Sequence, residues 1–213
     1  TIGNAGNAAD TEGNPDPAGA VDYEYRISTY EISRAQVTAA GMGSTLDDMA
    51  SYGGNGDDRP ATGLTWYEAA KFVNYLNTSA GAQAAYKFDG GGNFQLWDSG
   101  DAGYDATNPY RNSLAQYWLP NVDEWYKAAY YDPDTGTYFE YPTGSNTEPT
   151  SVSGGTDEGT AVFGQDFGTG PADVDNAGGL SPYGVMGLGG NVWEWEETAT
   201  DLPNDSPTEN RAY

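Results

Sequence analysis

Glycine and proline recur along the whole of this chain, and they limit how much helix and sheet it can form. The sequence has 30 Gly and 12 Pro among its 213 residues. Both residue types favour turns, Gly because it adopts positive φ angles and Pro because its φ angle is fixed. So many turn-forming residues predict long loops between the regular elements, and such long loops are unusual in a compact domain. The 17 Tyr and 6 Trp residues nevertheless supply enough apolar area for a core, which argues against disorder throughout.

A small number of regular elements can be predicted between the loops. Thr65 and Glu68 form a capping box, which predicts a helix from Trp66 to about Asn77. Further helices are predicted from Ser33 to about Ala40 and after Pro120, and strands over residues 21–30 and 138–141. The sequence therefore indicates an α+β domain with little regular secondary structure. We divide it into an irregular lead-in, residues 1–20, and a single domain, residues 21–213.

The charge of the chain restricts its partners. The 32 acidic and 8 basic residues give a formal net charge of −24. A phosphate backbone or an anionic membrane needs a basic surface, so nucleic acid is excluded as a partner and membrane binding is disfavoured. Insertion into a membrane is not expected, because no apolar run approaches the length of a span. The acids fit a solvated surface in a saline medium, a protein that binds divalent cations, or one that binds basic partners.

Four blocks of the sequence, taken in order, resemble the formylglycine-generating-enzyme-like (sulfatase-modifying-factor) superfamily. They are residues 25–36 (YRISTYEISRAQ), 59–70 (RPATGLTWYEAA), 118–129 (WLPNVDEWYKAA) and 181–195 (SPYGVMGLGGNVWEW). The resemblance implies a C-type-lectin-like fold with long ordered loops. In the family, further core strands follow the last block, so we expect the chain to lack its C-terminal strands and a partner chain or segment to complete the fold after Tyr213.

The sequence is most similar to a group of exported bacterial members, many of which carry a PEP-CTERM sorting tail. Residues 108–113 (NPYRNS), 123–131 (DEWYKAAYY) and 141–145 (YPTGS) carry this similarity. It implies a protein located outside the cell or at the cell surface. The chain begins with Thr1, which we expect of an exported protein whose signal peptide has been removed, and equally of a trimmed sequence.

The resemblance also implies an oxidase or an iron enzyme, and the composition disagrees with both. The oxidase members use cysteines with copper, and the iron-dependent relatives use histidines. This chain has no Cys and no His, and thiolate and imidazole are the natural ligands of those metals. We therefore expect a protein that is not an enzyme.

The family also implies a Ca²⁺ site beside the last block. Carried over by position, the ligands are the carbonyl oxygens of Gly190 and Val192 and the carboxylate of Glu194. The family's aspartate ligand corresponds to Gly187 here, so water or a nearby acid would have to replace it. Asp173 and Asp175 are candidates for a second Ca²⁺ site further upstream. The alternative is that Glu194 serves the fold and that the loop acids are solvated.

The aromatic residues fall into two groups. Most tryptophans lie in the four blocks and are predicted to belong to the core: Trp66, Trp118, Trp125, Trp193 and Trp195. Trp97, Tyr104 and Tyr110 instead lie in a polar, acidic loop, where exposed rings could stack on a carbohydrate. Anchoring of the loop is the alternative reading.

These observations favour a non-catalytic protein of the cell surface or extracellular matrix. It would act by binding a glycan or by self-association, with Ca²⁺ as a possible stabilising ion. The alternatives are a Ca²⁺-dependent carbohydrate-binding module, a filament or sheath subunit, and a hydrolase that uses Asp and Glu, for which no positive feature exists.

Overall fold

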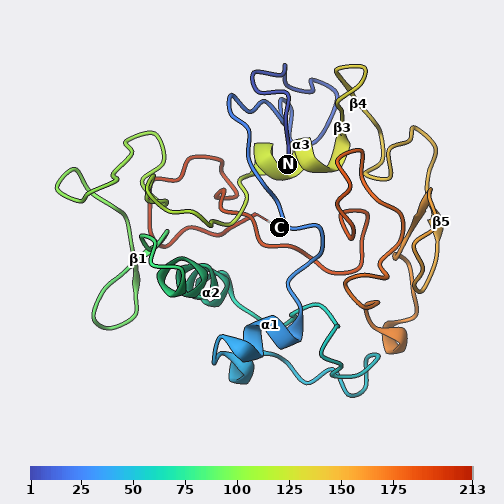
Figure 1. Cartoon of the computed structure of the whole chain (residues 1–213), viewed down its shortest axis with the longest axis horizontal. Helices are drawn as coiled ribbons and strands as arrows, with labels where there is room; N and C mark the ends of the chain where they lie inside the picture. The colour runs from blue at the N-terminus through green and yellow to red at the C-terminus, as the bar shows by residue number, and fades with distance from the viewer. Residues whose placement is uncertain (213) are drawn as a thin grey trace. The chain divides into compact units, whose positions relative to one another are not determined.

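The computed structural model describes residues 1–212, and the last residue, Tyr213, after which we expected a further segment, lies outside them. The chain divides into two compact units, and we describe each by itself. Unit 1 comprises Thr1–Gly63 and Val122–Trp193, and unit 2 comprises Leu64–Asn121 and Glu194–Tyr213. The helices are few and the strands short, as an α+β, C-type-lectin-like domain requires (Figure 1).

Unit 1 holds most of the short elements. Its helices are α1 (Arg34–Ala39) and α3 (Val122–Tyr130), with single 3₁₀ turns η1 (Gly43–Thr45) and η2 (Phe167–Thr169). Its strands are β3 (Tyr131–Asp132), β4 (Thr137–Tyr138), β5 (Thr150–Ser151) and β6 (Thr160–Ala161). Strands β3 and β4 form an antiparallel hairpin, whereas β5 and β6 are parallel.

Unit 2 is built on α2 (Trp66–Ser79) and on the antiparallel strands β1 (Lys87–Phe88) and β2 (Phe94–Gln95). The predicted capping box is present, since Thr65 accepts a hydrogen bond from the Glu68 backbone and the Glu68 side chain accepts one from the Thr65 backbone. These bonds satisfy backbone donors that the first turn of a helix leaves open. The prediction of helix α2 is therefore confirmed, and the helix ends two residues later than expected.

The prediction of a strand over residues 21–30 is wrong. Of these residues, Tyr25 alone forms a bridge, with Ile2, and the Tyr25 hydroxyl donates to the carbonyl of Glu124 in α3. A strand needs a continuous ladder of backbone partners, and alternation in the sequence does not supply one. Residues 1–20, expected as an irregular lead-in, lie inside unit 1, where Ile2 is buried.

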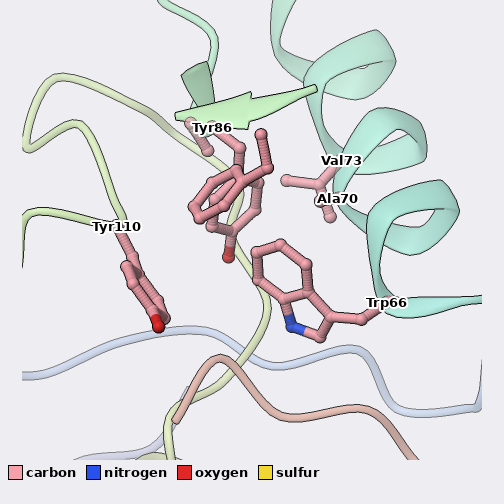
Figure 2. Packing of buried hydrophobic residues seen from close by; sticks show 7 residues of the cluster. Trp66, Ala70, Val73, Tyr86 and Tyr110 are labelled. Atoms are coloured by element: carbon pink, nitrogen blue, oxygen red, sulfur yellow. The ribbon is translucent and has the colours of Figure 1, made fainter. Parts of the chain in front are cut away.

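The largest core cluster belongs to unit 2, where α2 faces the β1–β2 hairpin and the loop that follows it (Figure 2). The cluster consists of Trp66, Ala70, Val73, Ala85, Tyr86, Phe94 and Tyr110. The Trp66 ring meets those of Tyr86 and Phe94 edge to face at centroid distances of 5.3 and 5.0 Å. Such contacts stabilise a core beyond the area that they bury.

A second, smaller cluster lies in unit 1 and holds Val162, Ala172, Ala177 and Met186. Three of its members, Ala172, Ala177 and Met186, lie in residues 172–191, a stretch fastened mainly by turns and isolated backbone bridges. Among residues 1–212, no helix is both long enough and apolar enough to cross a membrane.

Candidate functional site

The turn that contains the expected Ca²⁺ ligands Gly190 and Val192 is held by Asn191, which lies between them. Its backbone has a φ angle of 65°, a conformation that Asn tolerates better than most residues. The Asn191 side-chain oxygen accepts a hydrogen bond from the Ala172 backbone at 2.7 Å, and its Nδ2 donates to Glu31 Oε2 at 2.6 Å. The turn is thereby fastened to two distant segments of unit 1.

Glu31 brings a carboxylate to the position where the family has an aspartate. Gly187 has a φ angle of 94°, and a Cβ placed on it would lie 3.0 Å from Glu31 Cδ. The Glu31 carboxylate therefore lies against the space that an aspartate at position 187 would fill, and it is 8% exposed. Gly190 and Val192 lie in the same unit as Glu31, and carboxylate and carbonyl oxygens are the ligand types that Ca²⁺ prefers. The residues present fit the ion by their chemistry.

The boundary between the two units falls within the last block. Gly190 and Val192 belong to unit 1, which ends at Trp193, whereas Glu194, which is half-buried, belongs to unit 2. Trp193 is 82% exposed, so its prediction as a core residue is wrong. Trp195 is half-buried, packs against the core of unit 2 and donates from Nε1 to the Leu64 carbonyl at 2.8 Å. The backbone here is not a strand, so alternation does not decide which ring is covered.

The aspartates of the second expected Ca²⁺ site have different surroundings. Asp173 forms an ion pair with Arg59, at 3.2 Å between Oδ1 and Nε, and Asp175 is exposed. Within residues 1–212, no three acidic side chains gather into a set that could hold a metal ion.

The three aromatic residues proposed as a carbohydrate platform do not form one. Tyr110 is fully buried in the core of unit 2, and its hydroxyl is bonded to Ser206 and Arg211, so the prediction that its ring is exposed is wrong. Trp97 is half-buried and donates from Nε1 to the Ala85 carbonyl at 2.9 Å. Tyr104 is also half-buried. Tyr110 and Trp97 instead anchor the loop, which was the alternative interpretation.

A cleft of about 630 Å³ opens in unit 1, at a place that the sequence did not indicate. Residues 8–14 form one wall, and α3 with the chain around β4 forms the other. Figure 1 shows these segments, the N-terminal stretch in blue beside α3 and the β3–β4 hairpin. The side chains that give the cleft its chemistry are Asp10, Thr11, Glu12, Asn14, Tyr126, Tyr130, Thr137, Tyr138, Phe139 and Glu140.

Helix α3 contributes two tyrosines to the second wall of the cleft. Tyr126 and Tyr130 are four residues apart, which places them on the same face of a helix, and their ring centroids are 4.6 Å apart. The Tyr126 hydroxyl donates to Asp10 Oδ2 at 2.7 Å. Gly13 lies so close to this hydroxyl that a Cβ at position 13 would overlap it. Tyr126, a residue of one wall, therefore contacts the opposite wall at Asp10 and Gly13.

The β3–β4 hairpin supplies a third tyrosine, Tyr138, to the cleft. Tyr138 packs against Tyr126 at a centroid distance of 5.7 Å. Its hydroxyl donates toward the carbonyls of Ala8 and Gly19, each at 2.9 Å, and receives a hydrogen bond from Asn7 Nδ2 at 2.7 Å. These bonds join the hairpin to the N-terminal segment, so the cleft has a defined width.

All charged side chains that line the cleft are acidic. Asp10, Glu12 and Glu140 contribute carboxylates, and none of the lining residues in the described part of the chain is Lys or Arg. Burial raises the pKa of Tyr126, with a further contribution from its hydrogen bond to Asp10. Burial likewise raises the pKa of Tyr130 and of Tyr138. The phenols therefore stay neutral, and the charge of the cleft is that of its carboxylates.

The comparison with protein families agrees with the fold. Residues 3–206 match the sulfatase-modifying factor enzyme 1-like domain. Treponema denticola variable protein 1 is similar in structure, with 20% sequence identity and a TM-score of 0.48, over 92% of this chain and 74% of the other. No curated protein matches the chain.

Proposed function

Because this chain belongs to the sulfatase-modifying factor enzyme 1-like family and has neither Cys nor His, we propose that it is a non-catalytic binding domain. The oxidative chemistry that the resemblance implied needs thiolate or imidazole ligands for copper or iron. Residues 1–213 offer oxygen ligands in their place. Binding therefore suits this chain better than oxidation.

The observation that carries the proposal is the cleft of unit 1. Small-molecule and peptide sites are concave, lined by aromatic side chains and equipped with a few polar groups that orient the ligand. The cleft has aromatic side chains from two elements and carboxylates at its rim. Glu12 and Glu140 are exposed, so their oxygens remain accessible to a ligand.

The test is to block the cleft without altering the rest of the domain. Thr137 is exposed and lines the cleft from β4. A Thr137→Trp substitution should fill the cleft and abolish binding of a ligand found by screening immobilised oligosaccharides and peptides. Thr147 is also exposed, and it does not line the cleft, which makes Thr147→Trp the matched control.

Two results decide the matter. Loss of binding in Thr137→Trp, with normal binding in Thr147→Trp and unchanged circular dichroism in both, would support the proposal. Every ligand of the wild-type protein binding equally well to Thr137→Trp would overturn it. An oxidase assay with copper and a cysteine-containing peptide should show no turnover above that of the free metal.

A further inference from the structure

We propose that the cleft of unit 1 recognises an organic cation, namely the Lys or Arg side chains of a basic peptide segment on a partner protein. This inference rests on the proposed function, since it names the ligand that the binding domain takes. Its first support is the charge of the lining, which is entirely carboxylate. An anionic ligand would be repelled there, and it would meet no basic side chain among the described lining residues.

The aromatic lining supports a cation more specifically than it supports a neutral ligand. The face of an aromatic ring attracts a guanidinium or ammonium group held within about 6 Å of its centroid. Tyr126, Tyr130 and Tyr138 bring phenol rings to the same cleft as the three carboxylates. The aliphatic stem of Lys or Arg can pack on such rings while its charged end reaches a carboxylate.

The chain already uses this pairing inside its own fold. In unit 2, the Arg211 guanidinium lies over the rings of Trp66 and Tyr110, at 4.5 and 4.1 Å from the centroids. Arg211 is 5% exposed, so the rings replace much of the water around the charge. In unit 1, Lys127 Nζ lies 5.8 Å from the Tyr131 ring. A cleft with tyrosines and carboxylates offers an incoming basic side chain the same surroundings.

The size of the cleft favours a peptide over a single amine. A volume of about 630 Å³ lies within the range of ordinary ligand pockets and exceeds the volume of one basic side chain. Its carboxylates lie in two walls, Asp10 and Glu12 in one and Glu140 in the other. Two or more basic side chains on an extended segment could reach both walls at once.

The experiment compares a charged peptide with a neutral peptide of the same shape. Acetylated tetra-arginine amide and its tetra-citrulline counterpart would be titrated into the full chain by calorimetry, with cellotetraose as a neutral sugar. Two double variants carry equal net charge. Glu12→Gln with Glu140→Gln alters the cleft, and Glu148→Gln with Glu158→Gln removes the same charge from exposed positions outside it.

We expect tetra-arginine to bind and tetra-citrulline to bind at least about tenfold more weakly, because the attraction requires the charge. The cleft variant should raise the Kd of tetra-arginine about tenfold, and the control variant by less than about twofold. An equal loss in both variants would show that the diffuse field of the acidic protein is responsible, and it would overturn the inference. Failure of tetra-arginine to bind would overturn it as well.

These outcomes also separate the inference from the proposed function. If cellotetraose binds and Thr137→Trp abolishes its binding while tetra-arginine does not bind, the cleft is a binding site for a neutral sugar. The proposed function then stands and the inference fails. If Thr137→Trp affects no ligand of the protein, the proposed function fails too.

Discussion

Tyr86 donates its phenolic hydrogen to Glu197 Oε2 at 2.8 Å, and both side chains are almost completely buried within unit 2 although 111 positions separate them. The same hydroxyl accepts a hydrogen bond from the Leu119 backbone at 2.9 Å. Burial, and then the negative charge of Glu197, raises the pKa of Tyr86 well above its ordinary value. This pair therefore ties three distant segments of unit 2 together through a neutral phenol and a carboxylate.

A Tyr86→Phe substitution should destabilise the protein by about 3 kcal/mol. It removes the hydroxyl from two buried partners, Glu197 Oε2 and the Leu119 N–H, and an unsatisfied buried group costs its full desolvation penalty. The free energy of unfolding in urea would measure the loss. Tyr75 is 41% exposed on helix α2, so Tyr75→Phe is the control and should stay within about 0.5 kcal/mol of wild type. Equal stability of the two variants would contradict the prediction.

A Tyr126→Phe substitution should cost about 1 kcal/mol, since it removes a single hydrogen bond, the one to Asp10. Because this bond holds the wall of the cleft, backbone amides of residues 10–14 should also exchange with solvent faster. Hydrogen exchange would detect the change, with the exposed Tyr30→Phe as the comparison. Unaltered exchange at residues 10–14 would mean that Tyr126 does not hold this wall.

Stability should fall on acidification, and Asp101 should contribute to the fall. Its hydrogen bond with Lys87, at 2.6 Å from Nζ to Oδ2, lowers the pKa of Asp101. A carboxyl group with a lowered pKa in the folded state stabilises the fold above its unfolded pKa, about 3.9, and that contribution is lost as the pH falls through the folded pKa. Asp101→Asn should therefore weaken the pH dependence of the urea midpoint below about pH 4. An unchanged acid profile would contradict this.

Stability should also fall at alkaline pH, and Lys87 should contribute to this loss. The hydrogen bonds that Lys87 donates to Asp101 and Asp98 raise the pKa of Lys87, so its contribution to stability is complete below its unfolded pKa of about 10.4. The contribution is lost as the pH rises through the folded pKa. Lys87→Met should reduce the loss of stability in strong alkali, measured as the urea midpoint against pH, and Lys71→Met is the control for removal of one positive charge from unit 2. An alkaline profile that is the same for both variants would argue against a role for this ion pair.

Calcium should stabilise the protein through Glu31. We expect the melting temperature to rise with Ca²⁺ and to return on chelation, because an ion that binds the folded state stabilises it. Glu31→Gln should remove this difference, whereas the exposed Glu148→Gln should keep it. A wild-type melting temperature that is the same with Ca²⁺ and with chelator would end the proposal of a Ca²⁺ site near Gly190 and Val192.

Local patterns predicted the helices well and the strands poorly. Thr65 forms the predicted capping box with Glu68, and Ser33, predicted to begin a helix, caps α1 together with Gln36. Both caps operate within four residues. A strand depends on a partner elsewhere in the chain. Residues 21–30 alternate like a strand but find a backbone partner at Tyr25 alone, so the same pattern gave a wrong prediction.

The candidate sites show the same division. The family resemblance of residues 181–195 predicted Gly190 and Glu194 as Ca²⁺ ligands and Gly187 as the position of a missing one. Nothing in the sequence connected Glu31 to Gly187, more than 150 positions away. The cleft was missed for the same reason. Tyr126 lay in a predicted helix, and residues 8–14 were assigned to an irregular lead-in.

The sequence by itself determined the family, the short helices and the absence of thiol and imidazole ligands, because these follow from residue identity and from spacing within a few positions. The tertiary structure decided which aromatic rings are covered and which acids meet. Tyr110 is buried and Trp193 is exposed, although both rings are large and apolar. Burial depends on what the rest of the chain packs against a side chain, and in a fold held by long loops those neighbours come from distant segments.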